Sequence, residues 1–187
     1  MGKKKDPHTP GRFRKLVSTP EALADFRRVY DIPDDVTLEL AELGAVREGS
    51  ESPRLAPFSV LSIVEGGVRF PLHPELQNFL AQAGINPLQL LTRAYRILSG
   101  AIAMSSKIGA RFGVSEILEH CSFMDFGRGL YYFRAKVDKP DLFHFLVDKD
   151  DHDQDFLLVG GNWEFASSDK APAKRMRVKK GTRGPLN

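Results

Sequence analysis

Apolar residues recur at intervals of three and four along much of the first two thirds of the chain, the spacing that places them on one face of a helix. Thr19 followed by Pro20 is typical of a helix start, because threonine caps free backbone N–H groups and proline tolerates the first helical position. The apolar face ends at Ile32–Pro33, since the residue before a proline avoids helical torsions. The pattern therefore predicts a first short helix that starts at Thr19–Pro20 and closes before Pro33.

Further segments show the same period. Residues 59–65 fit either a strand or a short helix, and Gly66–Gly67 behind them favours the helix, because glycine adopts the left-handed turn at a helix end. His73–Pro74 and Asn86–Pro87 are two more predicted helix starts. The predicted helices are 59–65, 74 to about 83 with Gly84 as C-cap, 87 to about 110, and 115–121. The longest carries a predicted buried stripe of Leu88, Leu91, Tyr95, Leu98, Ile102 and Ile108.

Beyond Gly129 the period shortens towards two, and aromatic and branched residues become common, which is typical of strands. The predicted strands are 130–137, 142–147 and 156–159, and 36–43 alternates loosely enough to be extended. Residues 163–165 either complete the sheet or pack across it. Helices followed by strands predict an α+β fold, with a helix-rich N-terminal half packed against a small antiparallel sheet. We expect one domain over residues 19–165, without internal repeats.

Charge separates this domain from its flanks. Residues 1–15 hold six of the 27 basic residues and residues 166–187 hold seven, with one acidic residue in each segment. The remaining 14 basic and 22 acidic residues leave the centre at about −8, although the whole chain is at +3. Residues 1–18 and 166–187 lack apolar periodicity and are predicted to be disordered basic tails. An acidic body is a poor binder of phosphate backbones unless its cations cluster on one face.

Composition narrows the class of protein. A length of 187 residues suits one ordinary domain with tails, and 42% hydrophobic residues suffice for a core. The sequence has neither an apolar run long enough to span a bilayer nor an apolar leader, which predicts no membrane partner. Cys121 is the single cysteine, so no disulfide can form within the chain, and packing is its expected role. These features predict a reducing compartment, the nucleus or the cytoplasm.

Four short blocks occur in a distinctive order: Arg69-Phe70-Pro71-Leu72-His73-Pro74, Ala94-Tyr95-Arg96-Ile97-Leu98, Leu130-Tyr131-Tyr132-Phe133 and Trp163-Glu164-Phe165. In that order the chain resembles the gypsy-type transposon domain of plant retroelements, over residues 58–165. The domain usually has tryptophan where this chain has Tyr95. The resemblance implies a retrotransposon origin, and it carries no catalytic role that could be transferred to residues here.

Reactive side chains lack partners at catalytic spacing. His73 is either a general base or metal ligand, or the N-cap of the following helix, and the absence of a second ligand nearby favours the cap. An acidic cluster is either a cation site or a solvated hairpin loop, and it lacks the glycine turn and distal glutamate of a calcium loop. Its members are Asp148, Asp150, Asp151, His152, Asp153 and Asp155. Polymerase, aspartic protease, serine hydrolase and P-loop motifs are missing from the sequence. We therefore predict no enzyme, no catalytic residue, no cofactor and no metal site.

Two features bear on nucleic acid. Gly113-Val114-Ser115 resembles the turn of a helix-turn-helix, although the predicted recognition helix presents Glu116 and Glu119 to phosphates. The second feature is a cluster of cations, the basic run, which either binds nucleic acid or a nuclear import receptor or only solubilises the tail. The basic run consists of Lys174, Arg175, Arg177, Lys179 and Lys180. The sequence predicts a non-enzymatic interaction or assembly module with basic tails; the alternative is a sequence-specific DNA-binding domain using the Gly113 segment.

Overall fold

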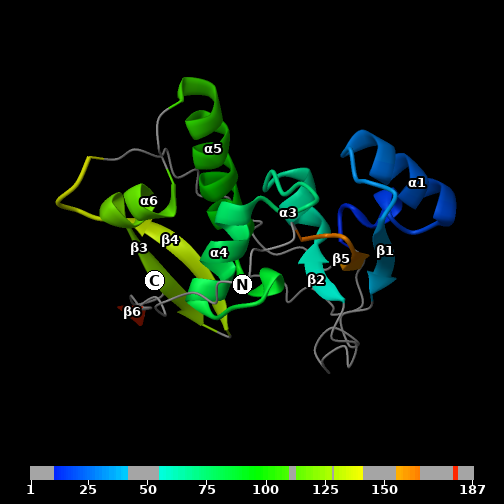
Figure 1. Ribbon diagram of the computed structural model, residues 1–187. Coiled ribbons are helices and arrows are strands. Elements are labelled where there is room, and N and C mark those ends of the chain that lie inside the picture. The colour runs from blue at the N-terminus through cyan, green and yellow to red at the C-terminus, as the bar shows by residue number, and fades with distance from the viewer. Residues whose placement is uncertain are drawn as a thin grey trace.

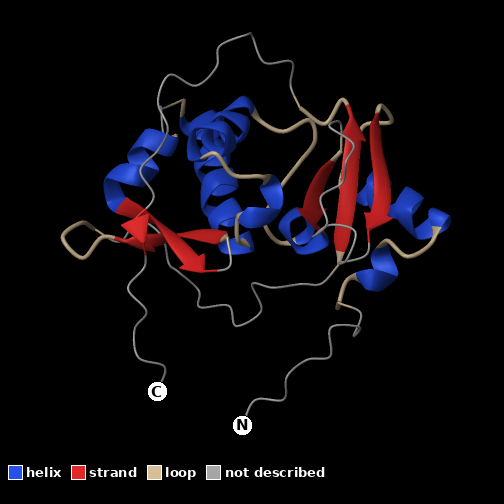
Figure 2. Cartoon of the chain, turned by 90° about the horizontal axis from the view of Figure 1, so that it is seen from below, coloured by secondary structure: helices blue, strands red, loops and turns tan. Residues whose placement is uncertain are grey.

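The computed structural model describes residues 11–41, 55–109, 113–127, 129–140 and 155–164, together with the backbone of a strand at 179–180. These residues form an α+β fold, as predicted. Helices α4 (Pro74–Ala83) and α5 (Thr92–Ile108) occupy the centre, and two three-stranded sheets lie on opposite sides of them (Figure 1, Figure 2). The pattern predicted a single sheet after the helices, whereas the strands divide between two sheets and two strands precede the central helices.

The first sheet has the strand order β1–β5–β2, and β5 pairs antiparallel with both neighbours. The strands are β1 (Val36–Ala41), β5 (Phe156–Gly161) and β2 (Ala56–Ser59). Val36 is opposite Gly161, and Ser59 is opposite Phe156, so the sheet joins the beginning of the domain to its end. The predicted strands 36–43 and 156–159 correspond to β1 and β5. Strand β2 was missed because its four residues include Pro57 and lie in a segment rich in loop-forming residues.

Three helices begin and end where local signals indicated. In α1 (Pro20–Val29) the Thr19 hydroxyl accepts a hydrogen bond from the Ala22 N–H at 3.1 Å. Helix α3 (Val60–Val64) ends before Gly67, which has the left-handed φ of 75°. Helix α4 is followed by Gly84 with φ 65°, as the C-cap prediction required. The caps decide these boundaries because they satisfy backbone groups that the helix itself leaves free.

The helix predicted from residue 87 begins later than expected. Residues Pro87–Gln89 form a single 3-10 turn, η2, which Asn86 and Gln89 close by exchanging side-chain and backbone hydrogen bonds. Leu90 and Leu91 are then extended, because the Leu91 N–H donates to the Tyr131 carbonyl at 2.9 Å instead of continuing a helix. Helix α5 therefore starts at Thr92. A tertiary contact thus overrides a strong local start signal.

The second sheet follows helix α6 (Val114–His120) without a connecting loop. Strand β3 (Cys121–Gly127) pairs antiparallel with β4 (Leu130–Ala135) and parallel with β6 (Lys179–Lys180). The predicted strand 130–137 corresponds to β4, whereas β3 was missed because no turn residue separates it from α6. Phe79 of α4 packs on this sheet, with its ring centroid 5.2 Å from Phe123 and 5.4 Å from Phe133. The predicted strand 142–147 lies outside the described residues.

The structure describes residues 11–18 of the predicted N-terminal arm and the backbone of residues 179–180 of the predicted C-terminal tail. Arg14–Leu16 form a 3-10 turn, η1, and Val17 is fully buried. The segment is held in place because the Gly11 and Phe13 N–H groups donate to the Asp155 carboxylate, near the other end of the domain. In the C-terminal tail, the backbone of Lys179–Lys180 forms β6, which pairs in parallel with Met124 and Asp125 of β3. No helix in the described part of the chain combines the length and apolar character needed to cross a bilayer.

Candidate functional site

The sequence blocks that carry the family resemblance meet inside the fold. The Leu72 N–H donates to the Trp163 carbonyl at 2.7 Å, so the first block pairs with the last. Phe58 lies between them, with ring centroids 5.1 Å from Phe70 and 5.7 Å from Trp163, both edge-on. Edge-on aromatic contacts stabilise beyond the area that they bury. These blocks therefore hold the first sheet to the start of α4.

The second block has a similar structural role. The Tyr95 side chain is 1% exposed, and its hydroxyl donates to the Pro87 carbonyl at 2.7 Å. Burial raises the pKa of the Tyr95 hydroxyl, so this group stays protonated and acts as a donor. The third block contributes the Tyr131 carbonyl that receives the Leu91 N–H. The hydrogen bonds and ring contacts in these blocks are internal to the fold.

His73 is the N-cap of α4. Its Nδ1 accepts a hydrogen bond from the Glu75 N–H at 3.2 Å, and the side chain is exposed. The Nδ1 atom thereby satisfies one of the backbone N–H groups that the first turn of the helix leaves free. This geometry matches the capping interpretation made from the sequence.

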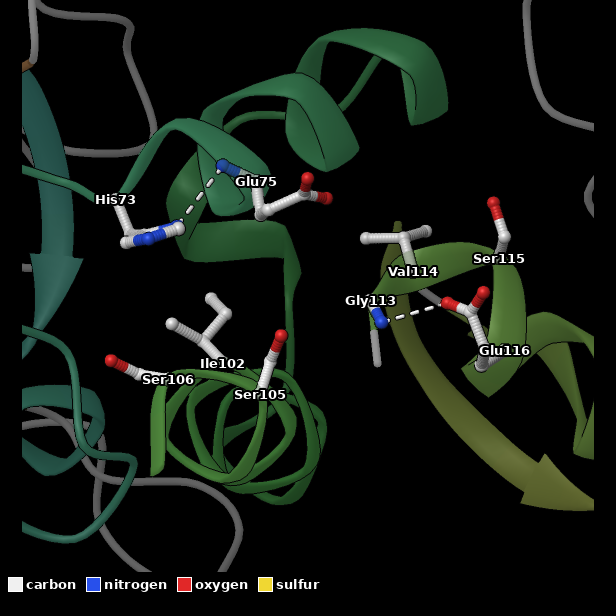
Figure 3. A pocket seen from close by; sticks show the side chains of 9 residues that line it. All are labelled: His73, Glu75, Ile102, Ser105, Ser106, Gly113, Val114, Ser115 and Glu116. Carbon is white, nitrogen blue, oxygen red and sulfur yellow. Dashed lines mark hydrogen bonds between the residues drawn. The ribbon is translucent and has the colours of Figure 1, made fainter. Parts of the chain in front are cut away.

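A pocket of about 560 Å³ opens beside His73, between the start of α4, the second half of α5 and the start of α6 (Figure 3). A Cβ placed on Gly113 would lie 3.4 Å from Glu75 Oε2 and 3.7 Å from Glu116 Oε2, so the two carboxylates converge on this glycine. The lining residues are His73, Glu75, Ile102, Ser105, Ser106, Gly113, Val114, Ser115 and Glu116. Sequence reasoning did not group these residues, because they come from three separate helices.

The Glu116 side chain caps the start of helix α6. Its Oε2 accepts the Gly113 N–H at 2.7 Å, which closes a capping arrangement at the start of α6. That hydrogen bond lowers the pKa of the Glu116 carboxyl, so the group is ionised at neutral pH. Within the lining, His73 caps one helix and Glu116 caps another. The lining thus offers hydroxyls and carboxylates, while the Nδ1 of His73 is occupied by the Glu75 N–H.

Asp155 is the member of the acidic cluster that the structure describes. Its side chain is 1% exposed and accepts the N–H groups of Gly11 and Phe13, each at 3.2 Å, while its carbonyl accepts the Val60 N–H at 3.0 Å. Asp155 therefore fastens the N-terminal segment to the first sheet. The other members of the cluster lie outside the described residues. In the described ranges, no group of three or more His, Cys, Asp or Glu side chains is placed to hold a metal ion.

Arginines of the body donate to the body itself. Arg27 reaches the carbonyls of Ile32 at 3.5 Å, Pro33, and Val36 at 2.7 Å. Arg69 reaches the carbonyls of Ile63 at 3.0 Å and Val68 at 2.7 Å. The fixed fork of a guanidinium suits such multiple carbonyl contacts, and each contact withdraws a donor from phosphate binding.

The two arginines of helix α5 also contact groups within the body. Arg93 lies over the Tyr132 ring, 4.3 Å from its centroid, and 5.7 Å from the Phe126 centroid. Arg96 pairs with the Glu65 carboxylate and also donates to the Glu65 carbonyl at 3.0 Å. Arg111 and Arg128, which would complete a cationic face, lie outside the described residues. Arg93 and Arg96 are thus engaged with aromatic rings and with Glu65.

The segment that resembles a helix-turn-helix is described from Gly113 onward. Helix α6 has seven residues, buries Ile117, and passes directly into β3. The Glu116 carboxylate accepts the Gly113 N–H, and Glu119 Oε1 lies 3.7 Å from Lys139 Nζ. Helix α6 itself contains no lysine or arginine that could bind a phosphate.

The basic run is described only in part. Lys179 and Lys180 form the backbone of β6 opposite Met124 and Asp125, whereas Lys174, Arg175 and Arg177 lie outside the described residues. Cys121 is buried, in keeping with the packing role expected from its position. Comparison of the chain with protein-family models, curated proteins and solved structures finds no match.

Proposed function

We propose that this chain is a non-enzymatic interaction or assembly module of retrotransposon origin, and that its basic tails bind nucleic acid. The body provides an acidic folded platform, and the basic run supplies the positive charge. A nuclear import receptor is a second partner for the same cations, which suits a location in the nucleus or the cytoplasm. The four sequence blocks in their order support the retroelement origin.

The observation that carries the proposal is the internal use of arginines in the described body. Arg27 and Arg69 are occupied by backbone carbonyls, Arg93 by aromatic rings, and Arg96 by Glu65. Nonspecific affinity for nucleic acid comes mainly from cations that neutralise phosphates. Because these guanidinium groups already contact carbonyls, rings or a carboxylate of the body, we expect the cations of the tails to bind the phosphates.

The alternative, a sequence-specific DNA-binding domain built on the Gly113 segment, has less support. A recognition helix needs side chains that donate to base edges or phosphates. Helix α6 instead carries Glu116 and Glu119, and its closing residue leads straight into a strand. Exchange of both glutamates for alanine should leave DNA affinity unchanged or raise it, if DNA never meets this helix.

A salt titration tests the proposal. The full chain and a chain ending at Phe165 are titrated with a 20-base-pair DNA duplex from low to physiological salt. Each lost phosphate contact reduces the slope of log affinity against log salt by about 0.9. We expect the full chain to show a steep slope and the shortened chain to bind weakly.

A matched variant separates charge from length. Substitution of all five cations of the basic run by glutamine keeps the tail but should reduce the slope by up to about 4.5. Lys107→Gln, which removes an exposed cation from α5, is the control and should change the slope by less than about 1. Salt-resistant binding by the chain that ends at Phe165 would assign nucleic-acid recognition to the body and overturn the proposal.

A further inference from the structure

The pocket between α4, α5 and α6 combines carboxylates with apolar side chains. Glu75 lies in the first turn of α4 and Glu116 in the first turn of α6. Their Oε2 atoms lie 3.4 Å and 3.7 Å from the position that a Cβ on Gly113 would take, so the two negative groups converge. Ile102 and Val114 contribute aliphatic carbon to the same lining, and Figure 3 shows Ile102 projecting from α5 towards the space between Glu75 and Gly113.

These groups favour a cation over an anion. The start of a helix often binds an anion through free backbone N–H groups. Here the Glu75 N–H donates to His73 Nδ1 at 3.2 Å, and the Gly113 N–H donates to Glu116 Oε2 at 2.7 Å. The second hydrogen bond lowers the pKa of the Glu116 carboxyl, which is therefore charged at neutral pH. An anion would thus meet a carboxylate and backbone donors that are already in use, whereas a cation would be attracted.

A guanidinium suits this arrangement better than a compact ammonium group. Its N–H donors fan out in one plane, so a single group can reach acceptors that approach from two different helices. The aliphatic stem of an arginine packs on apolar side chains while its head stays with the carboxylates. A volume of about 560 Å³ lies within the range of ligand sites in proteins and leaves room for an arginine side chain with the backbone beside it.

We propose that this pocket binds the guanidinium group of an arginine side chain in a partner protein. Glu75 and Glu116 accept its hydrogen bonds, and Ile102 and Val114 contact the aliphatic stem. The inference goes beyond the binding of nucleic acid by the tails, because the site lies on the acidic body and uses no residue of the basic run. A chain that binds no duplex would therefore still bind arginine, and the two proposals can fail separately.

Titration of the full chain with short peptides measures this selectivity. The probes are the tripeptides Gly-Arg-Gly and Gly-Lys-Gly, each acetylated and amidated, and the readout is the movement of the Glu75 and Gly113 amide signals in NMR spectra. We expect the arginine peptide to bind about threefold to tenfold more tightly than the lysine peptide. Free arginine, whose own carboxylate is repelled, should bind more weakly than the capped peptide. Amide signals that do not move, equal or tighter binding of the lysine peptide, or tighter binding of free arginine would overturn the proposal.

A charge-matched pair of variants locates the bound peptide. Glu75→Gln removes one carboxylate and keeps the backbone N–H that His73 accepts, so α4 retains its cap. We expect this variant to bind the arginine peptide about fivefold to tenfold more weakly, because a charge-assisted hydrogen bond is lost. Glu39→Gln removes an equal charge from an exposed position of β1 and should change the affinity by less than about twofold. Equal effects of the two variants would reduce the binding to general electrostatics and refute the site.

Gly113→Ala tests the shape of the site without changing its charge. The added methyl group would lie 3.4 Å from Glu75 Oε2, an ordinary contact distance, and close to Glu116 as well. It would therefore occupy the point on which the two carboxylates converge. We expect the arginine peptide to bind at least about threefold more weakly, while the helix content measured by circular dichroism stays the same. Unchanged affinity in this folded variant would place the peptide elsewhere and overturn the proposal.

Discussion

The two sheets of this protein are assembled over different distances along the chain. In the first sheet, Val36 pairs with Gly161, and β2 pairs with the same β5, so segments from both ends of the domain meet. In the second sheet, β3 and β4 form a hairpin that pairs Cys121 with Ala135. Long-range pairing must overcome the entropy of closing a long loop, whereas a hairpin closes a short one.

The contrast explains where each sheet places its interactions. The first sheet is reinforced by Phe58 and its aromatic neighbours, by the buried Asp155, and by the Asn162 N–H, which donates to the Asp35 carbonyl at 3.0 Å. The second sheet packs one face on Phe79 and leaves the Phe126 side chain half exposed. The first sheet joins segments from both ends of the domain, whereas the second is built around a local hairpin.

Truncation of aromatic side chains should separate the two sheets most clearly. Phe58 is fully buried, and Phe58→Ala should lower the free energy of unfolding by about 3–5 kcal/mol, because it leaves a cavity between Phe70 and Trp163. Phe126 is 53% exposed on β3, and Phe126→Ala should cost below about 1 kcal/mol. Urea unfolding measures both values. Similar losses for the two variants would mean that the sheets are equally packed.

Removal of the Asp155 carboxylate should have an intermediate effect. Asp155→Ala leaves the N–H groups of Gly11 and Phe13 without their acceptors, and we expect a loss of about 1–3 kcal/mol in unfolding free energy. The amides of these two residues should also exchange faster, because the N-terminal segment is released. Asp25→Ala, which breaks an exposed ion pair with Arg28, is the control and should cost below about 1 kcal/mol. Unchanged exchange at Gly11 would contradict an anchoring role.

The smallest expected effect is the acid response of α6. The Gly113 N–H lowers the pKa of Glu116 below its ordinary 4.5, so the folded state prefers the ionised carboxyl. The resulting stability is present above that ordinary value and is lost as the pH falls through the folded pKa. Glu116→Gln should therefore flatten the decline of stability below about pH 4.5, as measured by unfolding at a series of pH values. An acid decline equal to that of the unaltered protein would refute the capping contribution.

Local chemistry made the helices predictable. Capping signals act through atoms within one helical turn. Helix α1 begins directly after the cap Thr19, and α4 lies between its N-cap His73 and its C-cap Gly84. The capping interpretation of His73 rests on the same short range. Asn86–Pro87 shows the limit of such signals. It begins a single 3-10 turn, which ends because the Leu91 N–H donates to the Tyr131 carbonyl. A cap predicts that a helix can begin, and the tertiary contact decides whether it continues.

The candidate sites divide in the same way. The sequence could show that cations gather in the tails and that Glu116 and Glu119 oppose a DNA-reading helix, since charge is a property of the residues themselves. The sequence could not show that the Asp155 carboxylate accepts hydrogen bonds from backbone N–H groups 144 and 142 positions away. It also could not bring His73, Ser105 and Glu116 to one pocket, because three helices must first be packed.

The residues alone determined the class of fold, the starts of most helices and the separation of charge between body and tails. Periodicity, capping and charge act within a few residues, so each can be read without a partner. Only the tertiary structure decided the division into two sheets, the internal commitment of the arginines and the place of β6. Those outcomes depend on which backbone donors and acceptors remain unpaired after the rest has packed, and that remainder exists only in the folded chain.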